Sequence, residues 1–123
     1  MSLKTSTEVR HNVAIVRLAG DVTLGEASSQ LRDAIRQTLA AGHKAILLDL
    51  AGVGYIDSAG LGELIACHAA ALNQKATLKL LNLQKKVQGL MQITKLSTMF
   101  EAFEDEAEAV RSLQPNSAGP NTP

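Results

Sequence analysis

The sequence predicts an α/β fold with a mixed β-sheet of about five strands, mostly parallel after an initial hairpin, and with about four helices. Segments with strand character alternate with segments of helical periodicity through most of the chain, which is typical of parallel strands joined by helices. Only a short polar turn separates the first two strand-like segments, so they form a hairpin and make the sheet mixed.

The opening hairpin is the first element. We expect its strands over Glu8–Arg10 and Val13–Ala19, with the turn at His11 and Asn12. The following Gly20 ends the second strand.

A helix over Leu24–Ala41 comes next, because apolar residues recur at helical spacing between these positions. Thr23 and Glu26 form a capping-box pattern, which predicts that Thr23 caps this helix. Gly42 is expected to end it, since glycine accepts the left-handed backbone conformation that often follows a helix.

The second half of the chain continues the alternation. The apolar run Ala45–Leu50, interrupted only by Asp49, is typical of a strand buried on both faces. A helix begins at Asp57-Ser58 and is expected to turn one face inward, with Leu61, Leu64, Ile65, His68 and Leu72. The remaining predicted elements are a strand over Thr77–Asn82, a helix over Lys85–Leu96, a short strand over Met99–Phe103, and a helix over Asp105–Leu113 capped by Asp105.

Length and composition limit the organisation of the chain. Its 123 residues fit one domain, expected over residues 1–113. Residues 114–123 are rich in Pro, Asn, Gly and Ser and are expected to form a disordered tail.

Composition also argues against several classes of function. Twelve basic residues balance twelve acidic ones and only 2% of residues are aromatic, so we expect no direct binding of nucleic acid. The single cysteine, Cys67, cannot form an internal disulfide and is expected to be a small packed side chain. The lack of a signal peptide and of a long apolar segment predicts a cytoplasmic protein without membrane insertion.

The most informative stretch is Ala45–Leu64, AILLDLAGVGYIDSAGLGEL. It predicts a buried strand, a glycine-containing loop, and Asp57-Ser58 at the start of a helix. Gly60 and Gly62 fall in or near the first turn of that helix, where each glycine costs about 1 kcal/mol relative to alanine. Bare backbone beside a helix N-terminus suits a phosphate or a partner surface that must approach closely.

The segments Leu48–Leu50 and Ile56–Gly62 resemble the signature of STAS domains, and among these most of all the bacterial anti-sigma factor antagonists. The resemblance implies that Ser58 is phosphorylated by a partner kinase that is itself the anti-sigma factor. Many members carry a second serine where this chain has Ala59. By this resemblance the expected partner-binding residues are Asp21, Thr23, Asp57, Ser58, Ala59, Gly60, Leu61 and Gly62.

The loop after the second predicted strand departs from the family pattern. The family often has glycine, an acidic residue, an apolar residue and aspartate here, whereas this chain has Gly20-Asp21-Val22-Thr23. The acidic residue after the glycine matches, but Thr23 replaces the later aspartate. Helix capping is therefore the expected role of Thr23.

Two roles stay open at the start of the second helix. Serine is a good N-cap residue, and a capping hydroxyl at Ser58 is compatible with phosphorylation at the positive end of the helix. Asp57 either caps the helix or helps to position the Ser58 hydroxyl during phosphoryl transfer. In both cases the chemistry belongs to the kinase.

The same residues argue against other kinds of functional site. Gly52 and Gly54 suggest a dinucleotide loop, but Asp57 stands where a pyrophosphate would lie. A hydrolase with Ser58 as its nucleophile would need a general base, and the sequence offers no plausible one. A receiver domain phosphorylated on Asp57 would need an acidic pair, which the sequence also lacks. His11, His43 and His68 do not have metal-ligand spacing.

The sequence therefore predicts a regulatory protein that is not an enzyme, with no catalytic residues, cofactor or metal. Its expected partners are an anti-sigma factor serine kinase, which it binds when unphosphorylated, and a serine phosphatase that resets it. The sequence is also compatible with a homodimer and does not decide the oligomeric state. The alternative function is a STAS subunit of a lipid-transport ATPase or a stress-signalling scaffold.

Overall fold

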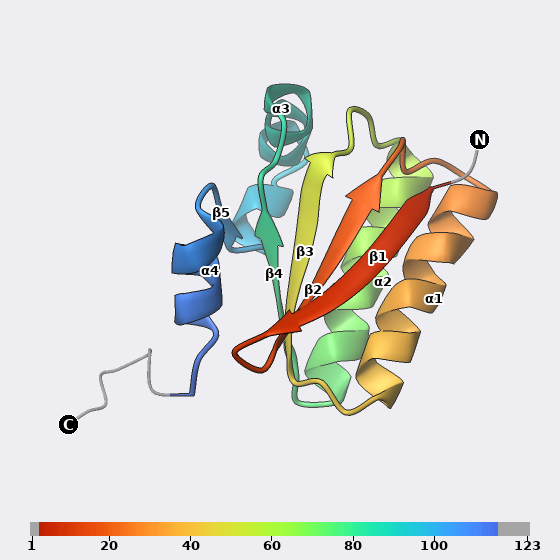
Figure 1. Cartoon of the computed structure of the whole chain (residues 1–123). Helices are drawn as coiled ribbons and strands as arrows, with labels where there is room; N and C mark the ends of the chain where they lie inside the picture. Colours follow the sequence, from red (N-terminus) through yellow and green to blue (C-terminus); the bar gives the residue numbers. More distant parts are fainter. Residues whose placement is uncertain (1–2, 116–123) are drawn as a thin grey trace.

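One five-stranded sheet forms the centre of the computed structural model, which describes residues 3–115 (Figure 1). The strands lie in the order β1-β2-β3-β4-β5, with β1 antiparallel to β2 and the other neighbours parallel. Their bounds are Lys4–Arg10 for β1, Val13–Ala19 for β2, Ala45–Gly52 for β3, Thr77–Leu81 for β4 and Ala102–Phe103 for β5. This confirms the predicted mixed sheet with an initial hairpin.

Four α-helices in the described residues pack on the sheet or extend from its ends. Their bounds are Glu26–Ala40 for α1, Ser58–Asn73 for α2, Lys85–Ile93 for α3 and Glu106–Ser112 for α4, with a 3-10 turn at Leu96–Thr98. Helices α1 and α2 lie side by side against one face (Figure 1), whereas α4 packs on the other face. None of the helices in the part of the chain that the structure describes is long and apolar enough to span a bilayer.

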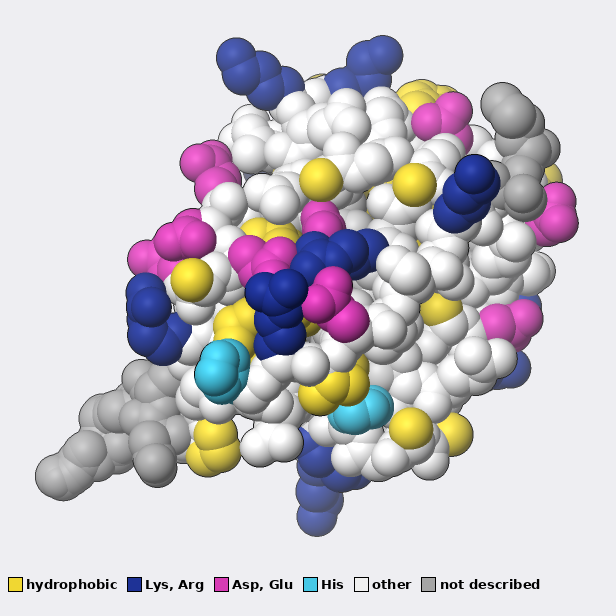
Figure 2. All heavy atoms as spheres, in the orientation of Figure 1, with side chains coloured by type: hydrophobic (Ala, Val, Ile, Leu, Met, Phe, Trp, Pro, Cys, Tyr) yellow, Lys and Arg dark blue, Asp and Glu magenta, His cyan; other side chains and the backbone are white. Residues whose placement is uncertain are grey.

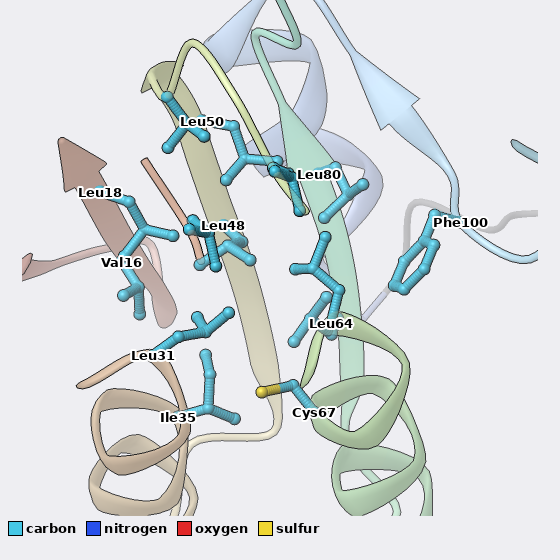
Figure 3. Packing of buried hydrophobic residues seen from close by; sticks show 14 of the residues in the cluster. Val16, Leu18, Leu31, Ile35, Leu48, Leu50, Leu64, Cys67, Leu80 and Phe100 are labelled. Atoms are coloured by element: carbon cyan, nitrogen blue, oxygen red, sulfur yellow. The ribbon is translucent and has the colours of Figure 1, made fainter. Parts of the chain in front are cut away.

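The sheet has a core on each face because successive side chains of a strand point to opposite sides. Ile46, Leu48 and Leu50 of β3 face α1 and α2, and Figure 3 shows Leu48 near Leu31 of α1 and Leu64 of α2. The side chain of Leu47 belongs to the smaller core under α4. The prediction that Ala45–Leu50 is buried on both faces is thus confirmed for Ile46–Leu50.

The β1–β2 turn has the expected position. His11 and Asn12 both have positive φ, 50° and 65°, as in the type I′ turns that match the twist of a two-residue hairpin. Strand β1 begins at Lys4, four residues before the expected start at Glu8. All seven of its residues are exposed, so no burial pattern marks the additional residues as strand.

The predicted start of α1 is wrong. The N-cap is Gly25, with φ 102° and no side-chain cap bond, and the helix begins at Glu26 instead of Leu24. Thr23 contributes its backbone carbonyl, which accepts hydrogen bonds from the N–H and the hydroxyl of Ser28. Leu24 lies outside the helix and is 79% exposed. The predicted end is confirmed, since Gly42 follows the helix with φ 95°.

Other boundaries shift for local reasons. Helix α3 ends at Ile93, three residues before the predicted Leu96, and Lys95 takes a left-handed conformation with φ 68°. Strand β5 covers only the last two residues of the predicted Met99–Phe103. Leu72, expected to face inward, is 58% exposed. The predicted cap of α4 is confirmed, since Asp105 accepts a hydrogen bond from the N–H of Ala107. The tail predicted for residues 114–123 falls, from residue 116, outside the described residues.

Candidate functional site

The loops that follow β2 and β3 meet at one end of the sheet. The backbone N–H of Val22 donates to the carbonyl of Tyr55 over 3.0 Å, and the N–H of Asp57 donates to the carbonyl of Val22 over 3.2 Å. These bonds form an isolated parallel bridge between Val22 and Ile56. The bridge places the loop containing Asp21 and Thr23 beside the start of α2.

Asp57 is the N-cap of α2 and also joins the two loops. Its Oδ1 accepts a hydrogen bond from the N–H of Gly60 over 2.8 Å, and its Oδ2 accepts one from the N–H of Leu24 over 3.0 Å. These backbone donors, Gly60 first, hold the pKa of the Asp57 carboxyl below its usual value. Of the two roles left open for Asp57, the geometry supports capping.

Ser58 is the first residue of α2 and is exposed to solvent, as the motif predicts. It does not cap the helix, because Asp57 fills that position. The free N–H groups of the first helical turn and the helix dipole favour a negative charge here. A phosphate on Ser58 therefore fits the electrostatics of its own helix, while its phosphorylation stays a prediction.

The two glycines of the motif have different environments. A Cβ built on Gly60 would lie 2.2 Å from the carbonyl oxygen of Val22 and 2.8 Å from Cγ2 of Ile56, so Gly60 lets the two loops approach each other. A Cβ on Gly62 would have no heavy atom within 4 Å, and Gly62 is exposed. The expectation of a bare patch for a partner therefore fits Gly62, whereas Gly60 is buried within the protein.

The other predicted partner-binding residues also differ in exposure. Asp21 is exposed, and Thr23 and Ala59 are half-buried around Ser58. Leu61 belongs to the core beneath α2, so its side chain offers little contact area to a partner.

Sequence reasoning missed two exposed apolar side chains next to this site. Leu24 donates its N–H to Asp57, and Tyr55, 49% exposed, accepts from Val22. The helical spacing predicts Leu24 as the first residue of a helix, and no sequence pattern marks Tyr55. Exposed apolar side chains next to polar ones are common at protein contact surfaces, so these two residues extend the candidate site.

A second polar cluster lies on the sheet face that carries α4. Arg17 Nη1 lies 2.7 Å from Asp49 Oδ2 and 3.0 Å from Glu106 Oε1, and Arg17 Nη2 lies 3.0 Å from Glu8 Oε1. These carboxylates, Glu106 first, raise the pKa of the Arg17 guanidinium further. Figure 2 shows side chains of both signs gathered over this face. We interpret the cluster as structural, since it ties α4 to β1, β2 and β3.

This cluster corrects one expectation. The sequence clusters five acidic residues at and before α4, which predicts a solvated face: Glu101, Glu104, Asp105, Glu106 and Glu108. Glu106 instead pairs with Arg17, and Glu101 Oε1 lies 3.0 Å from Lys79 Nζ.

The remaining candidate groups do not form a site of chemistry. Cys67 is buried, and burial raises the pKa of its thiol to about 12, which suits a packed and unreactive side chain. His68 lies against Phe100, with ring centroids 5.0 Å apart. Among the described residues no group of three or more His, Cys, Asp or Glu side chains could hold a metal ion. The strand order also differs from the 2-1-3-4-5 order of receiver-type folds.

We expect Asp57→Ala to lower the melting temperature, because it removes the N-cap of α2 and the tie to Leu24. Asp21→Ala, at an exposed aspartate of the same surface, is the control and should change little. Since the pKa of Asp57 is lowered in the folded state, its stabilising effect is complete above the usual aspartate pKa and is lost as the pH falls through the folded-state value.

Melting curves recorded at neutral pH and at about pH 3 measure both the loss of stability in Asp57→Ala and its dependence on pH. The difference between wild type and Asp57→Ala should shrink at the lower pH. A difference that stays constant with pH would contradict the role of the ionised carboxylate.

Comparison with known proteins gives a consistent picture. A family model described as the STAS domain matches residues 4–109. An anti-sigma factor antagonist from Mycobacterium paratuberculosis has a TM-score of 0.79 at 21% identity, covering 90% of this chain and 93% of that chain. The Bacillus cell fate determinant SpoIIAA, solved in its phosphorylated form, has a TM-score of 0.69 at 20% identity, covering 90% and 100%. A sulfate transporter family protein from Wolinella succinogenes has a TM-score of 0.67 at 16% identity, covering 84% and 85%. At these identities the likeness to solved structures shows a common fold.

Proposed function

The chain belongs to the STAS domain family, and from this membership we propose that it is a cytoplasmic anti-sigma factor antagonist controlled by phosphorylation of Ser58. The unphosphorylated protein binds an anti-sigma factor that is also a serine kinase, and so releases the sigma factor. The kinase uses ATP to phosphorylate Ser58, which ends binding, and a serine phosphatase restores the first state. The protein itself has no catalytic role in this cycle.

The exposure of Ser58 at the start of α2 is the observation that carries this proposal. A kinase must reach the acceptor hydroxyl without unfolding its substrate, and the first helical residue of an exposed loop satisfies this need. The phosphorylated form in which SpoIIAA was solved adds support from a protein with the same fold.

The surface around Ser58 indicates the character of the partner. Residues 20–26 and 53–62 contain Asp21, Glu26 and Asp57 but no Lys, Arg or His. The exposed apolar side chains Leu24 and Tyr55 lie on the same loops. We therefore propose a partner surface with an apolar centre and a basic rim, because charge complementarity guides encounter and apolar anchors supply binding energy.

The direct test is to incubate the protein with ATP and its cognate anti-sigma factor serine kinase, and to map the modified residue by mass spectrometry. A single phosphate on Ser58 is expected. Phosphate on another residue, with Ser58 unmodified, would rule out the proposed acceptor.

We expect Gly62→Asp to fold normally but to lose at least about tenfold in affinity for the kinase, or about 1.4 kcal/mol. Gly62 is exposed with open space around it, so the fold tolerates the side chain, while a closely approaching partner does not. Gly89→Asp, at a glycine of α3 that also has open space around its Cβ position, is the matched control.

Calorimetric titration of both variants with the kinase measures this effect. Equal affinities for wild type and Gly62→Asp would show that the partner does not approach this part of α2.

A second candidate function is favoured by the likeness to the sulfate transporter family protein. In that case the chain would be a STAS subunit of a transport system, such as a lipid-transport ATPase. Affinity purification from the native cells separates the two functions. A serine kinase in the complex supports the first, and transport subunits support the second.

A further inference from the structure

The end of the sheet opposite Ser58 has a cavity that the proposed switch does not use. Strands β2 and β3 run in parallel, and Ser58 follows the end of β3, whereas the β1–β2 turn precedes the start of β2. At that turn a cavity of about 580 Å³ opens between the hairpin and α4. Volumes of 300–1,000 Å³ are typical of sites for small molecules.

The walls of this cavity combine positive charge with an apolar surface. Arg10 and His11 line it from the hairpin, and Arg111 lines it from the last turn of α4. Ala107 and Val110, one turn apart on α4, supply the apolar part. A guanidinium on each side of an apolar wall is the arrangement that recognises an organic anion.

The acidic side chain at the cavity already has arginine partners. Glu106 also lines it, but its carboxylate lies 3.0 Å from Arg17 Nη1 and 3.5 Å from Arg10 Nη1. Arg111 forms no ion pair with any residue in the range 3–115. Its guanidinium therefore has its charge available for a ligand.

Positive charge extends beyond the cavity itself. A neighbouring hollow of about 400 Å³ shares His11 and is lined also by His43 and Lys44. Lys44 Nζ donates to the carbonyl of Gln74, which brings the loop with Lys75 to the same end. The segments 9–13, 41–45, 73–77 and 109–115 contain no Asp or Glu, although the whole chain has zero net charge.

We propose that the cavity between the β1–β2 turn and α4 binds a small organic anion, with its carboxylate between Arg10 and Arg111 and its apolar body on Ala107 and Val110. This site is independent of Ser58 and of the anti-sigma function, so its test does not depend on them. The ligand class follows from the two kinds of wall: an anionic group alone would leave the apolar wall unused, and an apolar molecule alone would leave the Arg111 guanidinium without an ionic partner, whereas Arg10 already contacts Glu8 and Glu106.

The test is a titration of the ¹⁵N-labelled full chain with sodium octanoate, followed by amide chemical shifts. Saturable shifts are expected at His11, Ala107, Val110 and Arg111. Octan-1-ol and acetate, which carry the apolar body and the carboxylate separately, should bind at least about tenfold more weakly. Equal binding of octanoate and either control would overturn the proposal, and so would the absence of saturable shifts at these residues.

Variants test the charge directly. Arg111→Gln should weaken octanoate binding about tenfold, as expected for the loss of one charge-assisted hydrogen bond. Arg36→Gln, at an exposed arginine of α1 on the other face of the sheet, is the matched control and should have no effect.

Ala107 is exposed, so Ala107→Glu and Ala107→Lys should both fold, which the same spectra check. The first should abolish binding and the second should retain it. The proposal would be overturned if Arg111→Gln and Arg36→Gln weakened octanoate binding equally. It would also be overturned if Ala107→Glu and Ala107→Lys did so.

Discussion

Phosphorylation of Ser58 is expected to lower the affinity for the anti-sigma factor kinase by more than about a hundredfold, which corresponds to about 3 kcal/mol. The phosphate adds about 1.5 to 2 negative charges at neutral pH. The N-terminus of α2 offsets part of the cost, by about 0.3 to 1 kcal/mol for an exposed group. In the proposed complex, however, the phosphate would be desolvated beside Asp57, and a buried charge without a matched counter-charge costs several kcal/mol.

The measurement compares wild type and Ser58→Ala after incubation with the kinase and ATP. Phosphorylated wild type should bind weakly and melt at nearly the same temperature as before, because Ser58 is exposed. Ser58→Ala should remain unmodified and bind persistently. Near-native affinity of the phosphorylated protein would contradict switching through Ser58.

Replacement of Gly60 by alanine is expected to destabilise the fold by about 2 kcal/mol, whereas the same change at Gly62 should stabilise it by up to about 1 kcal/mol. The methyl group on Gly60 would lie 2.2 Å from the backbone oxygen of Val22, so the two loops would have to separate. At Gly62 there is open space, and alanine only removes the cost of glycine in a helix.

Thermal or denaturant unfolding of the two variants measures the difference. At this chain length, 1 kcal/mol corresponds to a shift in melting temperature of about 4 °C, so the melting temperatures of the two variants should differ by about 8 to 12 °C. Because both changes are Gly→Ala in the same helix, intrinsic propensity cancels between them. Equal melting temperatures would mean that the loops adapt to the added methyl group.

The elements predicted correctly are those whose signal is local. Strand β3 is a continuous apolar run, and the turn at His11 and Asn12 is polar and lies between two strand-like segments. The structure bears out both, because burial on two faces and hairpin geometry depend on neighbouring residues. The exposure of Ser58 followed in the same way from the motif around it.

The errors arise where contacts between distant segments decide. Thr23 and Glu26 satisfy the capping-box pattern, yet the bonds from Val22 to Tyr55 and Asp57 fix this loop in a different path, and Gly25 becomes the cap. The need for glycine at position 60 arises from the close approach of the Val22 backbone, and Val22 lies 38 residues earlier in the chain. The pairing of Arg17 with Glu106 likewise depends on where α4 packs, which periodicity does not reveal.

The two hydrogen bonds that the Asp57 carboxylate accepts affect how readily the protein binds a partner. Because one carboxylate fastens the loop after β2 to the start of α2, the surface around Ser58 has its shape before any partner arrives. A preorganised surface loses little conformational entropy on association, so more of the contact energy is retained as affinity. In the proposed cycle, removal of the phosphate from Ser58 would therefore require no refolding before the protein binds its partner again.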